Sequence, residues 1–363
     1  EHGGHDLAAM TGLEKTDPRN RFMSGLPAQL VARALGLGGP AFALDAACAS
    51  SLYAIKLACD ALHDRRADTM LAGGVNCADD LFIHVGFCSL QALSRTGQSR
   101  PFHREANGLV PAEGAAFVLL KRLADAEADG DPIAGVIRGI GLSNDGRGGG
   151  LLAPDIQGQQ LALQSAYEMA GIDPSRVSLV ECHATGTSVG DAAELQTMAD
   201  IFEDATDLPI GSLKSNLGHL ITASGTAGLL KVLGALREKV RPATLHVESP
   251  IALPPGSPLR LLETAEPWES TESRVASVSN FGFGGNNAHL VVEEYIPGAL
   301  ATAEVAEPSR EPIAIVGLQV LAAGGEGVED FAADILSGRT RLSAGPDGEP
   351  TGRTEGVTLP LRG

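Results

Sequence analysis

Short apolar runs alternate with longer segments of helical spacing along most of the chain. In one such segment, Leu52, Ile55, Cys59 and Leu62 recur at the spacing of a buried helix face. The pattern predicts strands at 41–46, 69–75, 176–182, 208–213, 274–280 and 288–294, within 113–123 and within 132–142, and helices at 50–63, 157–170, 191–202 and 222–240. Strands that alternate with helices in this way favour a layered α/β fold.

Two stretches of the predicted pattern resemble each other. Residues 41–63 and 208–240 each consist of a strand, a chemically active residue and a helix rich in small side chains. This similarity suggests a duplicated half-domain.

The composition changes after Tyr295. Residues 297–310 are rich in Ala, Glu and Pro and have no apolar period, which is typical of a solvated linker. A buried strand is predicted at Ile313–Gly317 and a helix at Val328–Leu336, but too few residues follow to complete a domain. We therefore predict a first domain at 1–296, a linker at 297–310 and the beginning of a second domain at 311–363.

Charge and cysteine content exclude several classes of protein. The net charge of −18 over 363 residues disfavours nucleic acid and anionic membranes as partners. The five cysteines form no CxxC pair, so neither a zinc site nor a disulfide framework is predicted, and an odd count suits the reducing cytoplasm. The chain starts without a signal-peptide pattern, and no apolar stretch reaches the roughly 20 residues that cross a bilayer.

Four motifs contain the residues that are best suited to catalysis. Each follows or ends an apolar run, so all four can meet at one end of a sheet. They are Leu44–Ser51 around Cys48, Glu181–Thr187 around His183, Lys214–His219, and the glycine-rich Asn280–Asn287. One thiol, two histidines and a glycine-rich turn predict covalent acyl chemistry.

The chemistry follows from the residue types. A thiol attacks a thioester as the thiolate, and Cys48 precedes a predicted helix, whose N-terminus is expected to lower the thiol pKa. A malonyl thioester that loses carbon dioxide forms an enolate, which needs hydrogen-bond donors. His183 and His219 are suited to that task.

Simpler structural roles are expected for the other residues of these types. We expect four cysteines to be small buried core residues: Cys59, Cys77, Cys88 and Cys182. We expect four histidines to be structural groups with satisfied hydrogen bonds: His63, His84, His103 and His246. Gly282, Gly284 and Gly285 could serve only to form a tight hairpin, with no role in catalysis. The loop Ser143–Gly150 is expected to be a rim loop, because no Walker pattern supports phosphate binding.

In this order the four motifs resemble those of a β-ketoacyl synthase (ketosynthase) domain, and the resemblance covers roughly residues 7–296. It implies the thiolase-like layered αβαβα fold with duplicated half-domains. Within that family, the stretches Asp45–Ser51, Gly141–Gly148 and Glu181–Ala184 are most similar to ketosynthases of polyunsaturated-fatty-acid synthases and related glycolipid or iterative polyketide synthases.

The resemblance also implies roles for individual residues. His183 and His219 would face a malonyl group, and the backbone N–H groups of Cys48 and Phe283 would form an oxyanion hole. Lys214 would orient the histidine network, with the acidic Glu113 near it. The residues implied to bind substrate are Thr185, Thr187, Gly284, Gly285 and Asn286, the two threonines through the pantetheine arm.

The same resemblance implies the partners. Phosphopantetheine would arrive on an acyl carrier protein, with no metal and no diffusible cofactor. Asn286 departs from the family pattern, where many relatives have Thr, and the family's opening segment does not precede Glu1. We therefore expect an incomplete ketosynthase followed by a domain of the chain-length-factor type, in a homodimer or pseudo-dimer. A circular permutation, in which Ile313–Gly317 completes the first sheet, is the alternative.

The predicted function is decarboxylative Claisen condensation: an acyl group on Cys48 reacts with malonyl carrier protein and grows by two carbons. Two alternatives remain at this stage. One keeps the Cys48 thiol but ends at acyl transfer or thioester hydrolysis. The other is a non-catalytic assembly partner whose motifs are relics.

Overall fold

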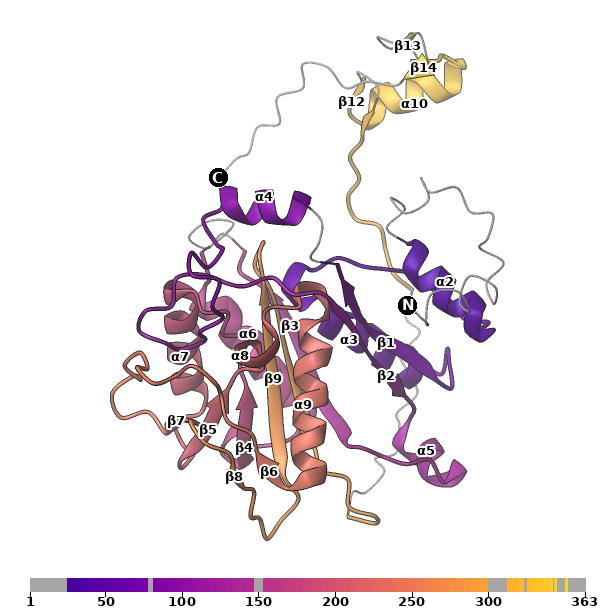
Figure 1. Cartoon of the computed structure of the whole chain (residues 1–363). Coiled ribbons are helices and arrows are strands. Elements are labelled where there is room, and N and C mark those ends of the chain that lie inside the picture. Colours follow the sequence, from indigo (N-terminus) through magenta and orange to yellow (C-terminus); the bar gives the residue numbers. More distant parts are fainter. Residues whose placement is uncertain are drawn as a thin grey trace. The chain divides into compact units, whose positions relative to one another are not determined.

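The computed structural model describes residues 25–77, 81–146, 153–299, 312–322, 325–341, 343–344 and 350–351 (Figure 1). The chain divides into one unit of residues 1–306 and another of residues 307–363. The end of the predicted rim loop, 147–150, and most of the predicted linker lie outside the described residues.

A mixed sheet forms the centre of the first unit. Its six strands are, in spatial order, β3 (Val136–Asn144), β10 (Asn286–Glu293), β9 (Val275–Gly282), β4 (Val177–Glu181), β5 (Leu208–Gly211) and β7 (Leu259–Leu261). The first three strands pair antiparallel, and β9, β4, β5 and β7 run parallel. Because β4 and β5 run parallel to β9, their carboxyl ends lie at the same edge of the sheet as the turn between β9 and β10.

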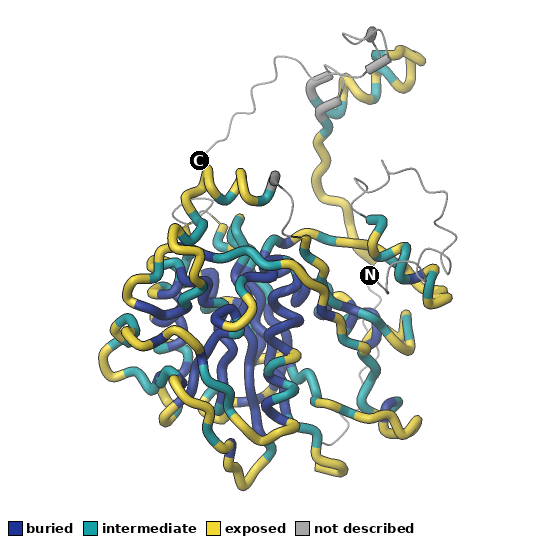
Figure 2. Tube along the Cα trace, viewed as in Figure 1, coloured by how far each residue is buried: buried dark blue, intermediate teal, exposed yellow. Residues whose placement is uncertain are grey.

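Helices cover both faces of this sheet. Helices α3 (Ser50–His63) and α9 (Ser224–Glu238) pack on one face, where α9 is seen in front of the strands in Figure 1. Helices α6 (Ile156–Ala170) and α7 (Ser188–Ile201) pack on the other face. Neighbouring residues of the central strands face opposite cores, as Val291 and Val292 of β10 do. The buried parts of the trace in Figure 2 gather in these strands and helices.

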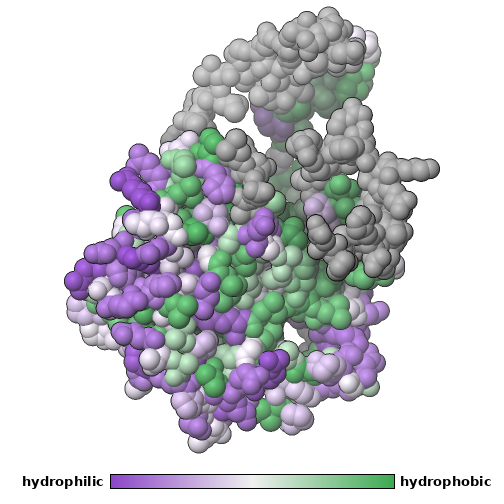
Figure 3. Space-filling view, in the orientation of Figure 1, coloured by the Kyte–Doolittle hydropathy of each residue, from purple (hydrophilic) through white to green (hydrophobic). Residues whose placement is uncertain are grey.

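An antiparallel strand pair lies beyond α3 and α9. It consists of β1 (Met70–Asn76) and β2 (Gly114–Leu120). Ala72 and Ala116 are buried against the helices, whereas Phe117 and Leu119 expose 40% and 70% of their surface. Apolar surface extends over α9 and β2 in Figure 3. The described residues thus supply four layers, helix, sheet, helix and sheet, of the layered α/β fold.

The remaining elements are short. In the first unit they are α2 (Leu26–Leu35), α4 (Leu81–Ser89), α5 (Leu123–Asp129), α8 (Lys214–Leu217), β6 (Val240–Arg241), β8 (Glu266–Pro267) and the 3₁₀ turns η3 (Ala47–Ala49), η4 (Pro174–Arg176) and η5 (Ile221–Ala223). The second unit contains β11 (Leu321–Ala322), β12 (Gly325–Glu326), α10 (Val328–Ser337), β13 (Ser343–Ala344) and β14 (Pro350–Thr351). No described helix combines the length and the apolar character needed to cross a bilayer.

Two predicted strands are absent. Residues 41–46 form no strand, and neither does Ile313–Gly317, where Ile313 and Val316 expose more than 90% of their surface. A strand needs a neighbour whose backbone pairs with it, and among the described residues neither segment has one. Among the described residues, all strands of the six-stranded sheet come from residues 136–293.

We predict that Gly141→Ala lowers the free energy of unfolding by about 3 kcal/mol or more. A Cβ atom at Gly141 would lie 1.9 Å from the carbonyl oxygen of Ala162, because α6 packs directly on β3. The matched control is Gly234→Ala within α9, where a Cβ atom meets nothing within 4 Å and should stabilise the helix by about 0.5–1 kcal/mol. Urea unfolding followed by circular dichroism measures both, and equal midpoints for the two variants would contradict the close packing.

Candidate active site

Cys48 lies in a strained turn directly before α3. The residue before it, Ala47, has φ +51°, a backbone conformation that residues other than glycine rarely adopt. The hydroxyl of Ser50 holds this turn, because it donates to the carbonyl of Ala47 at 2.6 Å and accepts from the N–H of Ala46 at 2.9 Å. The turn places Cys48 at the head of the helix, where only 3% of its surface is exposed.

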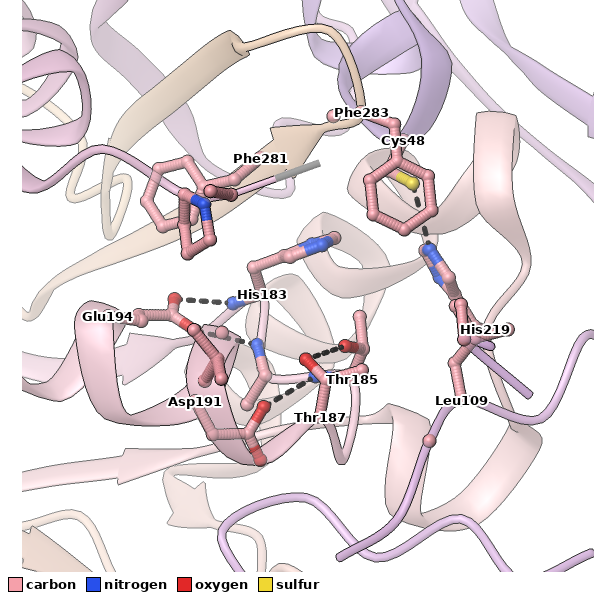
Figure 4. A pocket seen from close by; sticks show the side chains of 18 of the residues that line it. Cys48, Leu109, His183, Thr185, Thr187, Asp191, Glu194, His219, Phe281 and Phe283 are labelled. Atoms are coloured by element: carbon pink, nitrogen blue, oxygen red, sulfur yellow. Dashed lines mark hydrogen bonds between the residues drawn. The ribbon is translucent and has the colours of Figure 1, made fainter. Parts of the chain in front are cut away.

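Two imidazoles meet the thiol at the edge of the sheet (Figure 4). The Nε2 atom of His219 lies 3.0 Å from Sγ of Cys48. The ring centres of His183 and His219 are 5.4 Å apart, and the rings are nearly perpendicular. Sγ of Cys48 and one ring nitrogen of each histidine all lie within 4.8 Å of one another. The structure therefore brings together the three side chains that the sequence places in separate motifs.

The glycine-rich turn completes the surroundings of the sulfur. A Cβ atom on Gly282 would lie 2.6 Å from the carbonyl oxygen of Ala46 and 3.2 Å from the backbone nitrogen of Cys48. This close approach brings the backbone N–H of Phe283, together with that of Cys48, to the sulfur, where both lower the thiol pKa. The Phe283 ring contacts Phe87 of α4, with 5.8 Å between the ring centres.

The predicted substrate residues of this turn have different positions. Gly285 lines the pocket in front of Cys48. The Nδ2 of Asn144 in β3 donates instead to the carbonyl of Gly284 at 3.0 Å and to Oδ1 of Asn286 at 3.2 Å. Gly284 and Asn286 thus attach the turn to β3 and are not among the residues that line the pocket.

A pocket of about 520 Å³ opens onto the reactive groups. Besides Cys48, His183 and His219, its wall includes Leu109, Asp145, Thr185, Thr187, Phe281, Phe283 and Asn287. The hydroxyls of Thr185 and Thr187 lie 3.1 Å apart on this wall. The volume suits a small acyl thioester together with part of its carrier arm.

Burial raises the pKa of Cys48 to about 11, although the charge of Lys214 and the N–H groups of Phe283 and Cys48 oppose this shift. The prediction that the helix N-terminus gives a low thiol pKa is therefore wrong, because desolvation outweighs its effect. Burial, followed by the charge of Lys214, holds the pKa values of His183 and His219 well below 6.5. The resting pair is a neutral thiol in hydrogen-bond contact with a neutral imidazole.

Lys214 is buried close to the reactive groups. Burial lowers its pKa, while the negative charges of Glu181 and Glu194 favour the protonated form. Glu113, expected near Lys214, is instead exposed, with its carboxylate 3.8 Å from Sγ of Cys77. The carboxylates whose charge acts on Lys214 are those of Glu181 in β4 and Glu194 in α7.

Two buried carboxylates of α7 hold the loop that carries His183. Glu194 accepts the N–H groups of His183 at 2.6 Å and Ala184 at 2.7 Å, and burial raises its pKa to about 8 against these bonds. Asp191 accepts from Phe102, Thr185 and Gly186, and burial raises its pKa to about 6. Neither residue was predicted from the sequence, although two acidic side chains in a helix that packs on the core are a signal that could have indicated them.

Glu181 joins three further parts of the site. It ends β4, accepts the N–H of Leu213 at 2.7 Å and pairs with Lys231 of α9 at 2.5 Å. Both members of this ion pair are almost fully buried. The bond from Leu213 fixes the segment before Lys214 relative to β4, and the ion pair joins α9 to the same strand.

Comparison with known proteins decides the family. The model for the β-ketoacyl synthase N-terminal domain matches residues 4–126, and the model for its C-terminal domain matches residues 134–248. The chain belongs to the β-ketoacyl synthase family. Its layered α/β fold is that of the ketosynthase structures it resembles.

Individual synthases are clearly similar to it. Polyketide synthase PksL of Bacillus subtilis is 42% identical over 72% of this chain, and a polyunsaturated fatty acid synthase of a Thraustochytrium species is 38% identical over 86%. The chain spans only 6% and 16% of the lengths of these two proteins.

Two solved structures extend the comparison. The ketosynthase of module 6 of the bacillaene synthase from Bacillus subtilis is 41% identical, with a TM-score of 0.71, and the match covers 74% of this chain and 50% of that one. A structure titled PfaC Keto synthase-Chain length factor is also 41% identical, with a TM-score of 0.86, and covers 92% of this chain and 36% of that one.

We predict that alkylation of Cys48 by iodoacetamide accelerates from pH 7 to pH 10 without a plateau. A raised pKa means that the thiolate fraction keeps growing with pH until about 11. Lys214→Met removes a charge that favours the thiolate and should slow alkylation about tenfold at each pH below 10. Mass spectrometry of the Cys48 peptide measures the rates.

Lys239→Met removes an exposed charge and serves as the control, with no change expected. A rate that levels off at or below pH 8 in the wild-type chain would contradict the raised pKa of the thiol.

Proposed function

We propose that this ketosynthase catalyses decarboxylative Claisen condensation, extending a fatty acid or polyketide by two carbons. The observation that supports it best is the contact of 3.0 Å between Sγ of Cys48 and Nε2 of His219, with His183 beside them. The nucleophile Cys48, the proton acceptor His219 and the hydrogen-bond donor His183 thus face one pocket.

The first step is acyl transfer. The thiol proton of Cys48 moves to Nε2 of His219, and the sulfur attacks the carbonyl carbon of an acyl thioester. The N–H groups of Cys48 and Phe283 stabilise the oxyanion that forms. The carbon–sulfur bond to the carrier then breaks, and the leaving thiolate takes the proton back from His219.

The second step is decarboxylation and condensation. The bond between the malonyl carboxylate and its α-carbon breaks, carbon dioxide leaves, and the electron pair forms an enolate whose oxygen accepts from His183 and His219. The α-carbon attacks the acyl group on Cys48, and the sulfur leaves as a thiolate. The product is a 3-oxoacyl thioester two carbons longer.

Both histidines suit this double use. Their pKa values lie well below 6.5, so each neutral ring has one N–H donor and one acceptor nitrogen. The Nδ1 atom of neither ring has a hydrogen-bond partner among the described residues. The ring proton is therefore not fixed on one nitrogen, and His219 can accept at Nε2 in the first step and donate from Nε2 in the second.

Phosphopantetheine on an acyl carrier protein is the form in which we expect both substrates to arrive. The hydroxyls of Thr185 and Thr187 on the pocket wall support binding of the arm, and Lys214 supports the histidines through its charge. The proposed chemistry takes place at the Cys48 sulfur and the two imidazoles and requires no metal or diffusible cofactor. We infer a cytoplasmic location, which the five free cysteines support.

We further propose that residues 1–296 form the ketosynthase domain, 297–310 a linker, and 311–363 the beginning of a second, chain-length-factor-type domain. The match to PksL covers 72% of the chain, whereas the match to the ketosynthase–chain length factor structure covers 92%. The longer match supports a continuation into that second domain. It also supports a dimer or pseudo-dimer as the working assembly.

The full chain should take an acyl group onto Cys48 when it is given carrier protein loaded with an acyl group. With malonyl-loaded carrier protein it should then release carbon dioxide and produce the extended 3-oxoacyl chain. Cys48→Ala should abolish the acyl-enzyme and condensation, and His183→Ala should slow decarboxylation by about 10²–10³-fold. Mass spectrometry of protein and carrier measures each step, and Cys59→Ala in α3 is the matched control.

Two results would overturn the proposal. An acyl-Cys48 enzyme that never decarboxylates malonyl carrier protein would be an acyl-transfer enzyme. A folded chain whose Cys48 takes no acyl group would be a non-catalytic assembly partner.

A further inference from the structure

We infer that Asn280 is a positioning residue that holds the Cys48 turn, the segment after His219 and the Phe283 turn in one arrangement, and that it serves acyl transfer to Cys48 more than decarboxylation. This inference rests on the proposed function. It assigns a task to a buried side chain that touches neither the pocket nor a substrate.

The amide of Asn280 bridges two acceptors. Its Nδ2 atom donates to the carbonyl oxygen of Cys48 at 3.0 Å and to Oγ of Ser224 at 2.6 Å, which uses both hydrogens of the amide. Ser224 has one hydroxyl hydrogen, and its nearer acceptor is the carbonyl of Ile221 at 2.8 Å. A continuous hydrogen-bonded chain thus runs from Cys48 through Asn280 and Ser224 to Ile221.

This hydrogen-bonded chain connects three segments that are far apart in the sequence. Cys48 is the nucleophile, Ile221 follows His219, and Asn280 lies in β9 just before Phe283. A single buried amide therefore contacts the nucleophile directly and the histidine segment through one hydroxyl. It does so from the strand that positions the second oxyanion donor.

Both ends of this chain lie at strained backbone. Ala47, next to Cys48, has φ +51°, and the β-branched Ile221 has φ +44°. Such conformations persist only where the surroundings hold them. The two carbonyls bonded by the chain, those of Cys48 and Ile221, lie where that support is needed.

The arrangement affects one half of the reaction more than the other. The oxyanion hole needs the N–H groups of Cys48 and Phe283 together, and Gly282 lets the two turns approach to van der Waals contact. His183 is instead held by Glu194, and the backbone of His219 by Val110 and Ala112, independently of Asn280. Losing Asn280 should therefore misalign the oxyanion hole while the histidines stay in place.

The experiment compares acyl transfer with malonyl decarboxylation in the full chain. Asn280→Ala should slow acylation of Cys48 by about 10²-fold, the usual effect of losing one oxyanion donor, and change decarboxylation by less than about threefold. Ser224→Ala should shift the same ratio in the same direction by a smaller factor. The double variant should resemble Asn280→Ala, because the two side chains act in one chain.

Ser279→Ala is the matched control. Ser279 is the neighbouring buried residue of β9, and its hydroxyl bonds Nδ1 of His289 at 2.8 Å, away from Cys48. Its loss should change both rates by the same factor. Equal losses of both rates in Asn280→Ala and Ser224→Ala, or no loss in either, would overturn the inference.

A substrate-free measurement separates this inference from the proposed function. The N–H of Phe283 favours the Cys48 thiolate, so iodoacetamide should alkylate Cys48 several-fold more slowly in Asn280→Ala at pH 9, and at the wild-type rate in Ser279→Ala. A wild-type chain that alkylates normally but transfers no acyl group would refute the proposed function alone. Unchanged alkylation in Asn280→Ala and Ser224→Ala would refute the positioning role.

Discussion

Removal of the Cys48–His219 pair from water is the constraint on which the rest of the site depends. A buried thiol resists ionisation and a buried imidazole resists protonation, so neither group is charged at rest. In the proposed acyl transfer, the contact between them lets a proton move without a free thiolate that oxidants could reach. Lys214 moderates this balance, because its positive charge favours the thiolate and disfavours the imidazolium.

Buried charge elsewhere in the site organises the backbone. The carboxylates of Asp191 and Glu194 accept the N–H groups of the loop from His183 to Gly186, and Glu181 ties β4 to Leu213 and α9. A buried carboxylate is costly unless hydrogen-bond donors surround it, so each one specifies a local backbone path. The family's sequence motifs therefore mark reactive side chains, while less conspicuous acidic residues fix where those side chains lie.

The fold was predictable wherever local pattern and tertiary context agree. Helix α6 was expected at 157–170 and begins at Ile156, and strands β9 and β10 appear within a few residues of their predicted positions. The segment 41–46 has the same apolar character but no partner strand among the described residues, and it forms no strand. Strand formation depends on a neighbour far away in the sequence, which periodicity does not reveal. Helix α10 is local in origin and was predicted.

The sequence by itself determined the family and named the candidate reactive groups, because Cys48, His183, His219 and Phe283 lie in motifs whose residue types have few other uses. The tertiary structure alone decided the protonation of the Cys48 thiol, since its pKa depends on how completely Cys48 is buried. The helix N-terminus predicted from the sequence suggested the opposite shift. The tertiary structure also brought Glu194 to the backbone of His183 and Asn280 to that of Cys48, and it left Glu113 exposed beside Cys77. Burial and long-range hydrogen bonds are properties of residues brought together by folding, and no window along the chain contains them.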